Sequence, residues 1–421
     1  MQYWVSRDTL NPGVFIAITL VMIIAINYFG VKLFGEIEFY LSSIKVVVIL
    51  GLIFLSLILA CGGGPDGRAT GFVYWSNPGA FAEYIMTGSA GRFLAFWSVL
   101  TTAVFAYLGT ELVGVTVGEC QNPRRVIPRA IKLTFYRILL FYVVLVFLLG
   151  MLVPYNSKEL AAGIKAGGST ATASPFVVAI QLSGINALPA ILNACILLFV
   201  FSAANSDLYI ASRTLYGLAT VGNAPRLFAK TDKRGIPIYA LGLSSAFCLL
   251  AFLNVSSASQ TVFTYFVNLV TIFGILTWIS ILISHIYFAK ARAAQGIPDS
   301  ALAYVAPLGV AGSWGALIFC CLIAFFKGFN YFTYSPSYGQ VDYKNVITSY
   351  FGIPMYIVMI FGYKLFMKSP GRKAHNADLF TGKQAIDDEE AEFIASEKAR
   401  NDGRVKGKWE KIYDHSLGYL F

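Results

Sequence analysis

Charge is scarce in this chain. Of its 421 residues only 13% are Asp, Glu, Lys or Arg, whereas 57% are hydrophobic, and the mean hydropathy is +0.66. Soluble domains carry about 25% charged residues, and a water-soluble globule of this size cannot hide so many apolar side chains in its interior. The composition therefore excludes a soluble enzyme, a secreted disulfide scaffold and a disordered chain, and it indicates a protein of the lipid bilayer.

Several signatures of chemistry are missing as well. The sequence contains no nucleotide-binding GxxxxGK[ST] loop, which argues against an ATP-driven pump. Its six cysteines form no CxxC or other metal-ligand spacing, so they are interpreted as small packing residues and no metal site is predicted. No catalytic residue is predicted. The net charge of +10 comes from cations that lie between apolar runs, so we expect a lipid partner and no nucleic acid.

Long apolar runs are abundant. Nine of them reach the roughly 20 residues that a helix needs to cross the core of a bilayer. They are expected near residues 13–30, 39–60, 92–118, 137–154, 176–204, 237–254, 260–289, 302–326 and 345–367. Because the runs are continuously apolar rather than alternating, they predict an all-α polytopic membrane bundle.

The polar end of the chain is expected to be separate. Residues 1–368 are predicted to form the transmembrane domain and residues 369–421 a cytoplasmic tail. An acidic run at 387–392 lies in this tail. It is interpreted as a solvated segment or, alternatively, as a docking surface for trafficking factors.

The distribution of Lys and Arg predicts the orientation. Thirteen of them lie in the odd-numbered loops between the expected spans, and five lie in the even-numbered loops. Because cytoplasmic loops are enriched in Lys and Arg, the odd-numbered loops and the tail are predicted to face the cytoplasm. Residue 1 then faces outside without a cleavable signal peptide, which predicts an odd number of spans upstream of it.

Ionisable side chains inside a span are costly and are functional candidates by default. Lys45 in the second run and Glu111 in the third are of this kind, and either could bind and release a proton as its exposure changes. The other such groups are interpreted as interfacial or helix-end residues: Glu119, Asp207, Arg213 and His285.

The third run also predicts a broken helix. Residues 105–114 read Phe-Ala-Tyr-Leu-Gly-Thr-Glu-Leu-Val-Gly. A break at membrane depth is tolerated where the freed backbone lines a cavity, and there a half-helix N-terminus can bind a carboxylate while loose carbonyls bind an ammonium. A free amino acid carries both groups. The alternative is an unbroken helix whose small residues serve packing.

This run, continued through residues 122–125 and 128–131, resembles the sixth-span signature of fungal amino-acid permeases, members of the amino acid–polyamine–organocation superfamily. Residues 35–39 with 44–46 are similar to the opening of that family's fifth span, and residues 205–209 to the end of its eighth. The likeness covers essentially the whole chain. It is closest to the dicarboxylic branch, which takes up glutamate and aspartate with protons across the plasma membrane.

The resemblance implies a LeuT-like inverted-repeat bundle that lacks its first three helices, because the nine spans correspond to the family's fourth to twelfth. It implies proton-coupled uptake of amino acids, with no cofactor besides the proton. The residues that would line the substrate cavity are Phe105, Tyr107, Gly109, Thr110, Glu111, Ser202, Asn205 and Ser206.

By the same resemblance, Lys45 and Glu111 are the candidates for proton coupling. Lys45 and Arg213 are both open as partners of a second substrate carboxylate. Two other interpretations of the chain stay open: a non-transporting fragment or interaction protein, and a permease for neutral or general amino acids.

Overall fold

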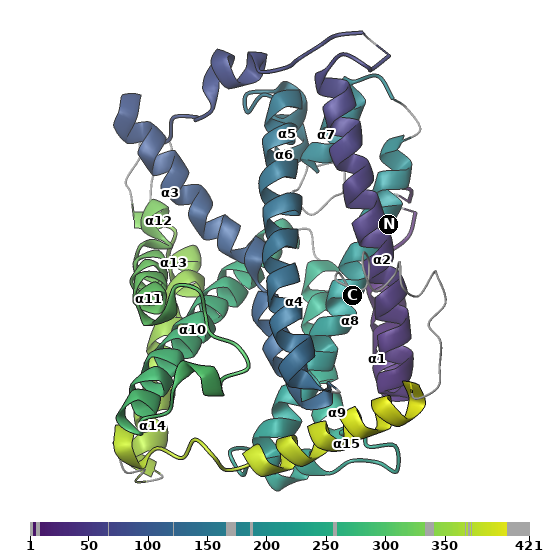
Figure 1. The fold of residues 1–421 in the computed structure, drawn as a ribbon. Coiled ribbons are helices and arrows are strands. Elements are labelled where there is room, and N and C mark those ends of the chain that lie inside the picture. Colours follow the sequence, from purple (N-terminus) through teal and green to yellow (C-terminus); the bar gives the residue numbers. More distant parts are fainter. Residues whose placement is uncertain are drawn as a thin grey trace. The chain divides into compact units, whose positions relative to one another are not determined.

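The structure is a computed structural model that describes residues 3–5, 9–65, 67–120, 122–165, 174–185, 188–255, 259–332, 341–366, 368, 371 and 373–401. Every regular element within these ranges is a helix (Figure 1). Among the described residues, nine helical stretches are long and apolar enough to cross a membrane. The predicted fold class, an all-α polytopic membrane protein, is confirmed.

The nine candidate spans are Pro12–Phe29, Val31–Ala60, Gly88–Val115, Pro123–Leu152, Leu188–Thr220, Ile238–Val255, Thr261–Ala294, Gly309–Phe332 and Tyr343–Phe366. Several edges lie close to their predicted positions. The second and fourth spans begin earlier than predicted. Their first turns carry polar and basic residues, which are compatible with a helix but lie outside the apolar runs used for the prediction.

The predicted edges of the fifth span are wrong. Residues 176–204 do not form one helix, because α7 (Pro175–Leu182) ends just before Gly184, which has a φ of +75°. Glycine adopts this left-handed conformation readily and commonly terminates helices. The span itself is α8 (Leu188–Thr220), so Asn205, Ser206, Asp207 and Arg213 lie inside this helix rather than at or beyond its end.

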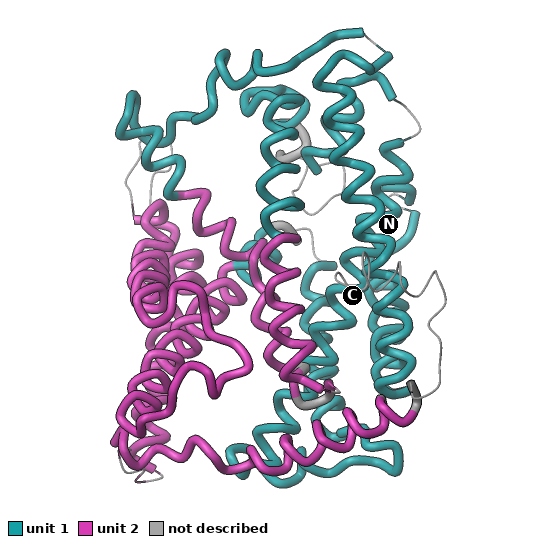
Figure 2. The backbone as a smooth tube through the Cα atoms, viewed as in Figure 1, with its two compact units in different colours: residues 1–97, 138–267 teal, residues 98–137, 268–421 magenta. Residues whose placement is uncertain are grey.

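The chain divides into two compact units (Figure 2). Unit 1 comprises residues 1–97 and 138–267, and unit 2 comprises residues 98–137 and 268–421. Two long helices continue from one unit into the other, α3 (Gly88–Tyr107) and α10 (Ser259–Ala294). The helix α4 (Pro123–Ile138) ends at the boundary between residues 137 and 138, where unit 1 resumes.

The remaining elements fall within single units. Those of unit 1 are α1 (Pro12–Phe29), α2 (Val31–Ala60), η1 (Trp75–Gly79), η3 (Leu139–Val144), α5 (Leu145–Leu152), α6 (Lys158–Lys165), α7, α8, η5 (Arg226–Ala229), α9 (Ile238–Cys248) and η6 (Leu249–Val255). Those of unit 2 are η2 (Thr110–Glu119), η7 (Asp299–Ala301), α11 (Gly309–Phe326), α12 (Phe329–Phe332), α13 (Tyr343–Tyr350), α14 (Gly352–Phe366), η8 (Ala374–Asn376) and α15 (Lys383–Asn401).

Each unit has its own apolar core. In unit 1, Leu59 of α2 packs in a cluster with Leu152 and Val178, and a second cluster joins Ile23 of α1 to Leu208 of α8. In unit 2, the buried face of α10 packs against α3 and α11 in a cluster of Val104, Ile272, Ile275, Leu276, Ile279, Ile323 and Ala324. These clusters hold the helices that carry the candidate site residues.

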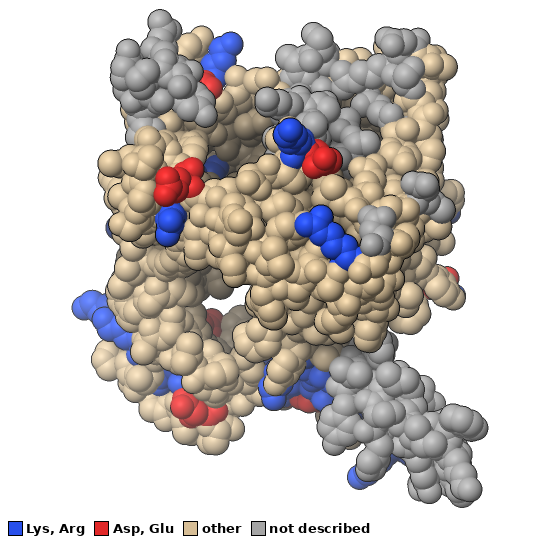
Figure 3. All heavy atoms as spheres, turned by 90° about the horizontal axis from the view of Figure 1, so that it is seen from above, with Lys and Arg blue, Asp and Glu red and all other residues tan. Residues whose placement is uncertain are grey.

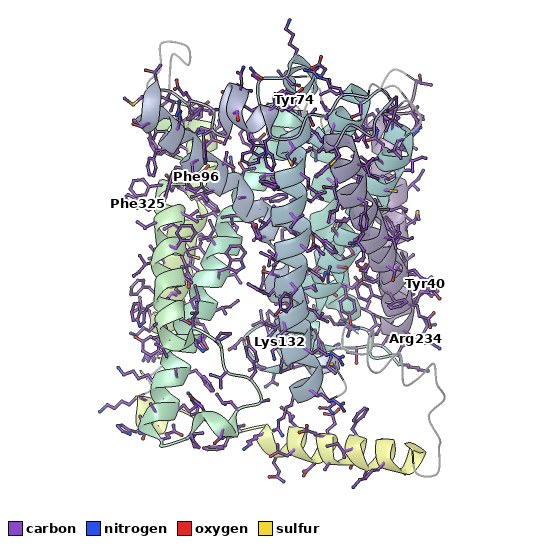
Figure 4. All side chains as sticks on the ribbon, turned by 45° about the horizontal axis from the view of Figure 1, so that its top comes forward. Tyr40, Tyr74, Phe96, Lys132, Arg234 and Phe325 are labelled. Atoms are coloured by element: carbon purple, nitrogen blue, oxygen red, sulfur yellow. The ribbon has the colours of Figure 1, made fainter. Side chains whose placement is uncertain are left out.

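In unit 1, odd-numbered loops lie beside one another at one end, and even-numbered loops lie beside one another at the other end. A β-carbon on Gly30, in the first loop, would lie 3.8 Å from Cδ1 of Ile236 in the fifth. In the second loop, Gly64 lies beside the backbone of Ser183 in the fourth. Figure 4 shows Tyr74 and Arg234 at opposite ends of this unit. The arrangement agrees with the alternation that the charge pattern predicts.

Unit 2 shows the same alternation. Gln295, in the seventh loop, donates hydrogen bonds to the carbonyl oxygens of Ala374 (3.2 Å) and Ala377 (2.8 Å) in the tail. Arg124, after the third span, pairs with Asp387 and Glu390 of α15. The third loop, the seventh loop and the tail therefore share one end, although the side of the membrane that this end faces stays a prediction.

Charge is sparse on the surface as well. On the face drawn in Figure 3, charged side chains form isolated spots on a surface of uncharged residues. Large apolar side chains are exposed along the spans, as in Val47 and Phe54 of α2. An apolar exterior of this kind is what acyl chains solvate.

Candidate functional site

The helix of the third span is broken at Gly109. α3 ends at Tyr107, Gly109 has φ +95° and ψ −9°, and a 3-10 helix follows from Thr110 to Glu119. A left-handed φ is available to glycine because it has no β-carbon. The predicted interruption of this span is confirmed.

The carboxylate of Glu111 lies at the break. Its Oε2 atom accepts a hydrogen bond from the backbone N–H of Gly109 at 3.1 Å and another from the indole N–H of Trp278 at 3.0 Å. The backbone N–H groups at the start of a helix have no partner within the helix and attract anions. Glu111 is therefore the anion that the protein itself supplies to this freed amide.

Two residues of α10 brace the break. Trp278 bonds Glu111, and Gly274 lies against Leu108, since a β-carbon on Gly274 would come within 2.1 Å of Leu108 Cδ2. Positions four apart share one face of a helix, so one face of α10 contacts the break on both sides of Gly109. Neither residue was predicted from the sequence, where a glycine and a tryptophan in an apolar run look like ordinary packing residues.

The other predicted residues of unit 2 flank the same break. Phe105 and Thr110 are exposed, and Tyr107 is partly buried. Phe105, Tyr107, Gly109, Thr110 and Glu111 are thus brought together around one discontinuity, but their contact with a substrate stays a prediction.

A second polar cluster lies in unit 1. The ammonium of Lys45 donates to Ser202 Oγ at 2.5 Å and lies 3.4 Å from Glu38 Oε1, and Ser202 lies 2.6 and 2.8 Å from the two oxygens of Glu38. Ser202 is fully buried, whereas the side chains of Lys45 and Glu38 are 25% and 22% exposed. The predicted intramembrane lysine therefore belongs to an ion pair that a serine of α8 bridges.

Glu38 was missed as a site residue, although the sequence carries a signal for it. It precedes Lys45 by seven residues, which is two helical turns, so both side chains lie on the same face of α2. The prediction began this span at residue 39 and so placed Glu38 outside the membrane segment. In the structure α2 begins at Val31.

Asn205 is completely buried and makes the next polar contact along α8. The side-chain amide of Asn27 in α1 donates to Asn205 Oδ1 at 3.0 Å and also to its own helix at Ile23 O. Ser206 is partly buried. Ser202, Asn205 and Ser206 thus share a face of α8, and the first two connect α8 to α2 and α1.

The ionisable groups interpreted as interfacial or helix-end residues make local contacts. The guanidinium of Arg213 lies 5.0 Å from the ring centre of Tyr209, which stacks on Phe34 at 4.0 Å. His285 Nδ1 lies 2.8 Å from Ser313 Oγ. The described residues contain no group of three or more His, Cys, Asp or Glu placed to hold a metal ion.

In the described part of the chain, nine helices that are long and apolar enough to cross a membrane define a multi-pass membrane protein, and a span broken at a glycine is a feature of secondary transporters. The chain belongs to the amino acid permease family, whose sequence profile matches residues 1–376. The family and its members' names point to a transporter rather than an enzyme.

Three relatives illustrate the similarity. The chain is 52% identical over 426 residues to the dicarboxylic amino acid permease of Saccharomyces cerevisiae, covering 100% of this chain and 69% of that protein. It is 38% identical over 389 residues to a proline-specific permease of Emericella nidulans, which covers 92% of this chain and 70% of that protein. It is 38% identical over 421 residues to the general amino-acid permease GAP1 of Saccharomyces cerevisiae, which covers 98% of this chain and 67% of that protein.

Proposed function

We propose that this chain takes up amino acids across the plasma membrane together with protons, and that glutamate and aspartate are its substrates. The observation that carries the proposal is the broken helix at Gly109, where a freed backbone amide holds a carboxylate. Glu111 occupies this amide, and broken helices of this kind are where secondary transporters bind their substrates. Membership of the amino acid permease family supports this assignment.

The acidic substrate class is supported by the similarity to relatives. Identity to a permease named for dicarboxylic amino acids is 52%, whereas identity to the proline-specific and general permeases is 38%. An acidic side chain calls for a cation, and unit 1 contains a candidate in Lys45, whose ammonium is partly exposed beside Ser202.

The Lys45–Glu38 pair supports the proposal of proton coupling. Inside a membrane, an ion pair resists losing either charge, because the remaining charge then lacks compensation. Protonation of Glu38 would leave the ammonium of Lys45 without its anion, and a carboxylate of the substrate could replace it. Proton binding and acidic substrate binding would then favour each other, as symport requires.

Uptake of labelled glutamate by permease-deficient yeast cells that express this chain tests the proposal. We expect uptake that a protonophore abolishes and that excess unlabelled aspartate inhibits, whereas proline and lysine do not. Gradient-independent uptake would contradict proton coupling, and equal inhibition by proline or lysine would contradict the acidic substrate class.

A fluorescent tag checks that the chain reaches the plasma membrane. If it does and no uptake is measured, the transport function is overturned and a non-transporting interaction protein is favoured. Digestion of the tagged tail in sealed cells and in inverted vesicles checks the orientation. We expect the tail to be cleaved in the inverted vesicles alone, as the predicted cytoplasmic C-terminus requires.

A further inference from the structure

The segment that follows the broken helix lies between two left-handed residues. Gly109 precedes η2 with a φ of +95°, and Asn122, between η2 and α4, has a φ of +53°. A positive φ is uncommon for residues other than glycine, and asparagine is among those that adopt it more often. Hinges absorb changes of φ and ψ at a few positions at the ends of elements. η2 has such a position on each side.

Two features of η2 itself favour movement. It is a 3-10 helix of ten residues, although 3-10 helices of more than about four residues are uncommon because their hydrogen-bond geometry is poor. Among the residues of η2 whose side chains the structure describes, none is buried, and Thr110, Gly114 and Val115 are exposed. A segment with few buried side chains is displaced at a lower cost in free energy than one in an apolar core. We therefore expect η2 to be displaced more easily than α10, whose buried face lies in the core of unit 2.

The tail fixes the chain just after this segment. Arg124, in the first turn of α4, pairs with Asp387 through Nη2 and with Glu390 through Nη1, the latter at 2.8 Å. Both acidic residues belong to α15. A guanidinium that pairs through two nitrogens is restrained in orientation as well as in position. We call these two ion pairs the tail contact, and they hold the start of α4 against α15.

The tail is also attached to α10. Gln295, just beyond the last turn of this helix, donates to the carbonyl oxygens of Ala374 and Ala377. At the other end of the segment, Trp278 of α10 donates to Glu111 beside the break. η2 is thus connected to α10 directly at its start and through the tail after its end. All of these groups belong to unit 2 (Figure 2).

We propose that the tail contact is autoinhibitory: by holding the start of α4 to the end of α10 through the tail, it restrains η2 and slows transport. Alternating access requires one part of a transporter to move against another. A contact that exists in one conformation alone stabilises that conformation relative to the others. Removal of the tail contact should therefore make the movement of η2 easier. This inference concerns the regulation of the site at Gly109 and rests on the proposed transport function.

The tail contact is weak enough to open. The side chains of Arg124, Asp387 and Glu390 are 34%, 37% and 22% exposed, so water and salt reach all three. Ion pairs with this exposure contribute modestly to stability, which corresponds to a change of roughly two- to fivefold in the rate of a movement that breaks them. A contact of this strength regulates the rate without abolishing transport.

Initial rates of labelled glutamate uptake by yeast cells test the inference, with surface expression matched by the fluorescent tag. D387N/E390Q removes the tail contact and should raise the maximal rate about two- to fivefold. D388N/E389Q removes the same number of charges from exposed positions of α15 and should keep the parent rate. An unchanged or lower rate in D387N/E390Q would overturn the inference, because the loss of a contact that only stabilises the fold does not raise the rate.

Charge reversal shows whether the ion pairs themselves are responsible. R124E replaces attraction with repulsion and should raise the uptake rate at least as much as D387N/E390Q. R124E/D387K/E390K restores opposite charges in reversed positions and should return the rate to that of the parent. A triple variant that stays as fast as R124E would assign the effect to the loss of Arg124 itself and would contradict the inference.

Amide hydrogen exchange of the purified full-length chain gives a readout that does not need transport. Exchange in residues 110–119 should rise about two- to fivefold in D387N/E390Q, and D388N/E389Q should match the parent. If the parent takes up glutamate but the two double variants exchange equally in residues 110–119, the tail contact does not restrain η2, and the inference fails while the transport function stands. If exchange rises but neither the parent nor any variant takes up glutamate, the transport function fails while the restraint of η2 stands.

Discussion

The indole Nε1 of Trp278 lies 3.0 Å from Oε2 of Glu111, the same oxygen that accepts the backbone N–H of Gly109. One carboxylate oxygen thus joins the side chain of α10 to the freed amide of the broken span. The two donors hold Glu111 in one place. A substitution of Trp278 removes one of them, and a substitution of Gly109 disturbs the backbone conformation that presents the other.

Replacement of Trp278 by Phe keeps an aromatic ring but removes the N–H donor to Glu111. Hydrogen bonds between membrane-embedded side chains contribute about 0.6–1.7 kcal/mol. We expect W278F to lower the glutamate uptake rate about three- to twentyfold and to lower the thermal unfolding temperature. W314F is the matched control, because Trp314 is 51% exposed on α11. Uptake by W278F equal to that of the parent would contradict a role of Trp278 in positioning Glu111.

The conformation of Gly109 can be tested against that of a glycine in the same segment. A β-carbon on Gly109 would meet no atom closer than Leu112 Cδ1 at 3.5 Å, but its φ of +95° strains any other residue. Such strain costs about 1–3 kcal/mol. We therefore expect G109A to be destabilised and to lose most transport. G114A should resemble the parent, because Gly114 has open space around it and no left-handed φ. Equal behaviour of the two variants would show that the break has no special importance.

The ion pair of α2 should show compensation between its two charges. K45M and E38Q each leave one charge without its partner. Both side chains are about one-quarter exposed. We therefore expect each single substitution to lower the free energy of unfolding by about 1–3 kcal/mol, which lies between the values for surface and buried ion pairs. The double variant should be more stable than either single variant by thermal unfolding, and all three should lose proton-dependent uptake. K32M, which removes an exposed lysine of the same helix, is the control.

The close contact between Gly274 and Leu108 predicts a rescue. Overpacking an interior costs about 1–3 kcal/mol, so G274A should lower the unfolding temperature by pushing Leu108 against the break. The double variant G274A/L108A should recover part of the loss, because the shorter side chain makes room for the added methyl group. G242A should be neutral, because a β-carbon on Gly242 would meet no atom within 4 Å. If G274A/L108A unfolds at the same temperature as G274A, the contact with Leu108 is not the cause of the lower stability.

The tail helix α15 is expected to detach when its acidic contact with Arg124 is removed. Asp387 and Glu390 both pair with this arginine, whereas Asp388 and Glu389 are exposed. Amide hydrogen exchange in residues 383–401 should rise in D387N/E390Q and also in high salt, which screens such pairs. D388N/E389Q removes the same number of charges and should leave exchange unchanged. Similar exchange in both double variants would mean that the contact does not hold the tail.

The sequence predicted the class of fold, the number of spans and the break at Gly109, because each depends on local properties of the chain. Apolar run length and the conformational freedom of glycine suffice for these features. It could not predict the partners Trp278 and Ser202, which are 167 and 157 residues away from Glu111 and Lys45. Such pairings depend on which helix faces are packed together. The edges of α8 were also missed, because Ser183 and Gly184 end α7 within an otherwise apolar run without a strong polar signal.

The length and continuity of α8 have a mechanical consequence. Ser202, Asn205 and Tyr209 are buried positions on one side of this 33-residue helix. They contact the Lys45–Glu38 pair, the amide of Asn27 and the ring of Phe34, respectively. A rotation of α8 about its own axis therefore alters all three contacts in the same movement. These contacts couple both α1 and α2 to the rotation of α8.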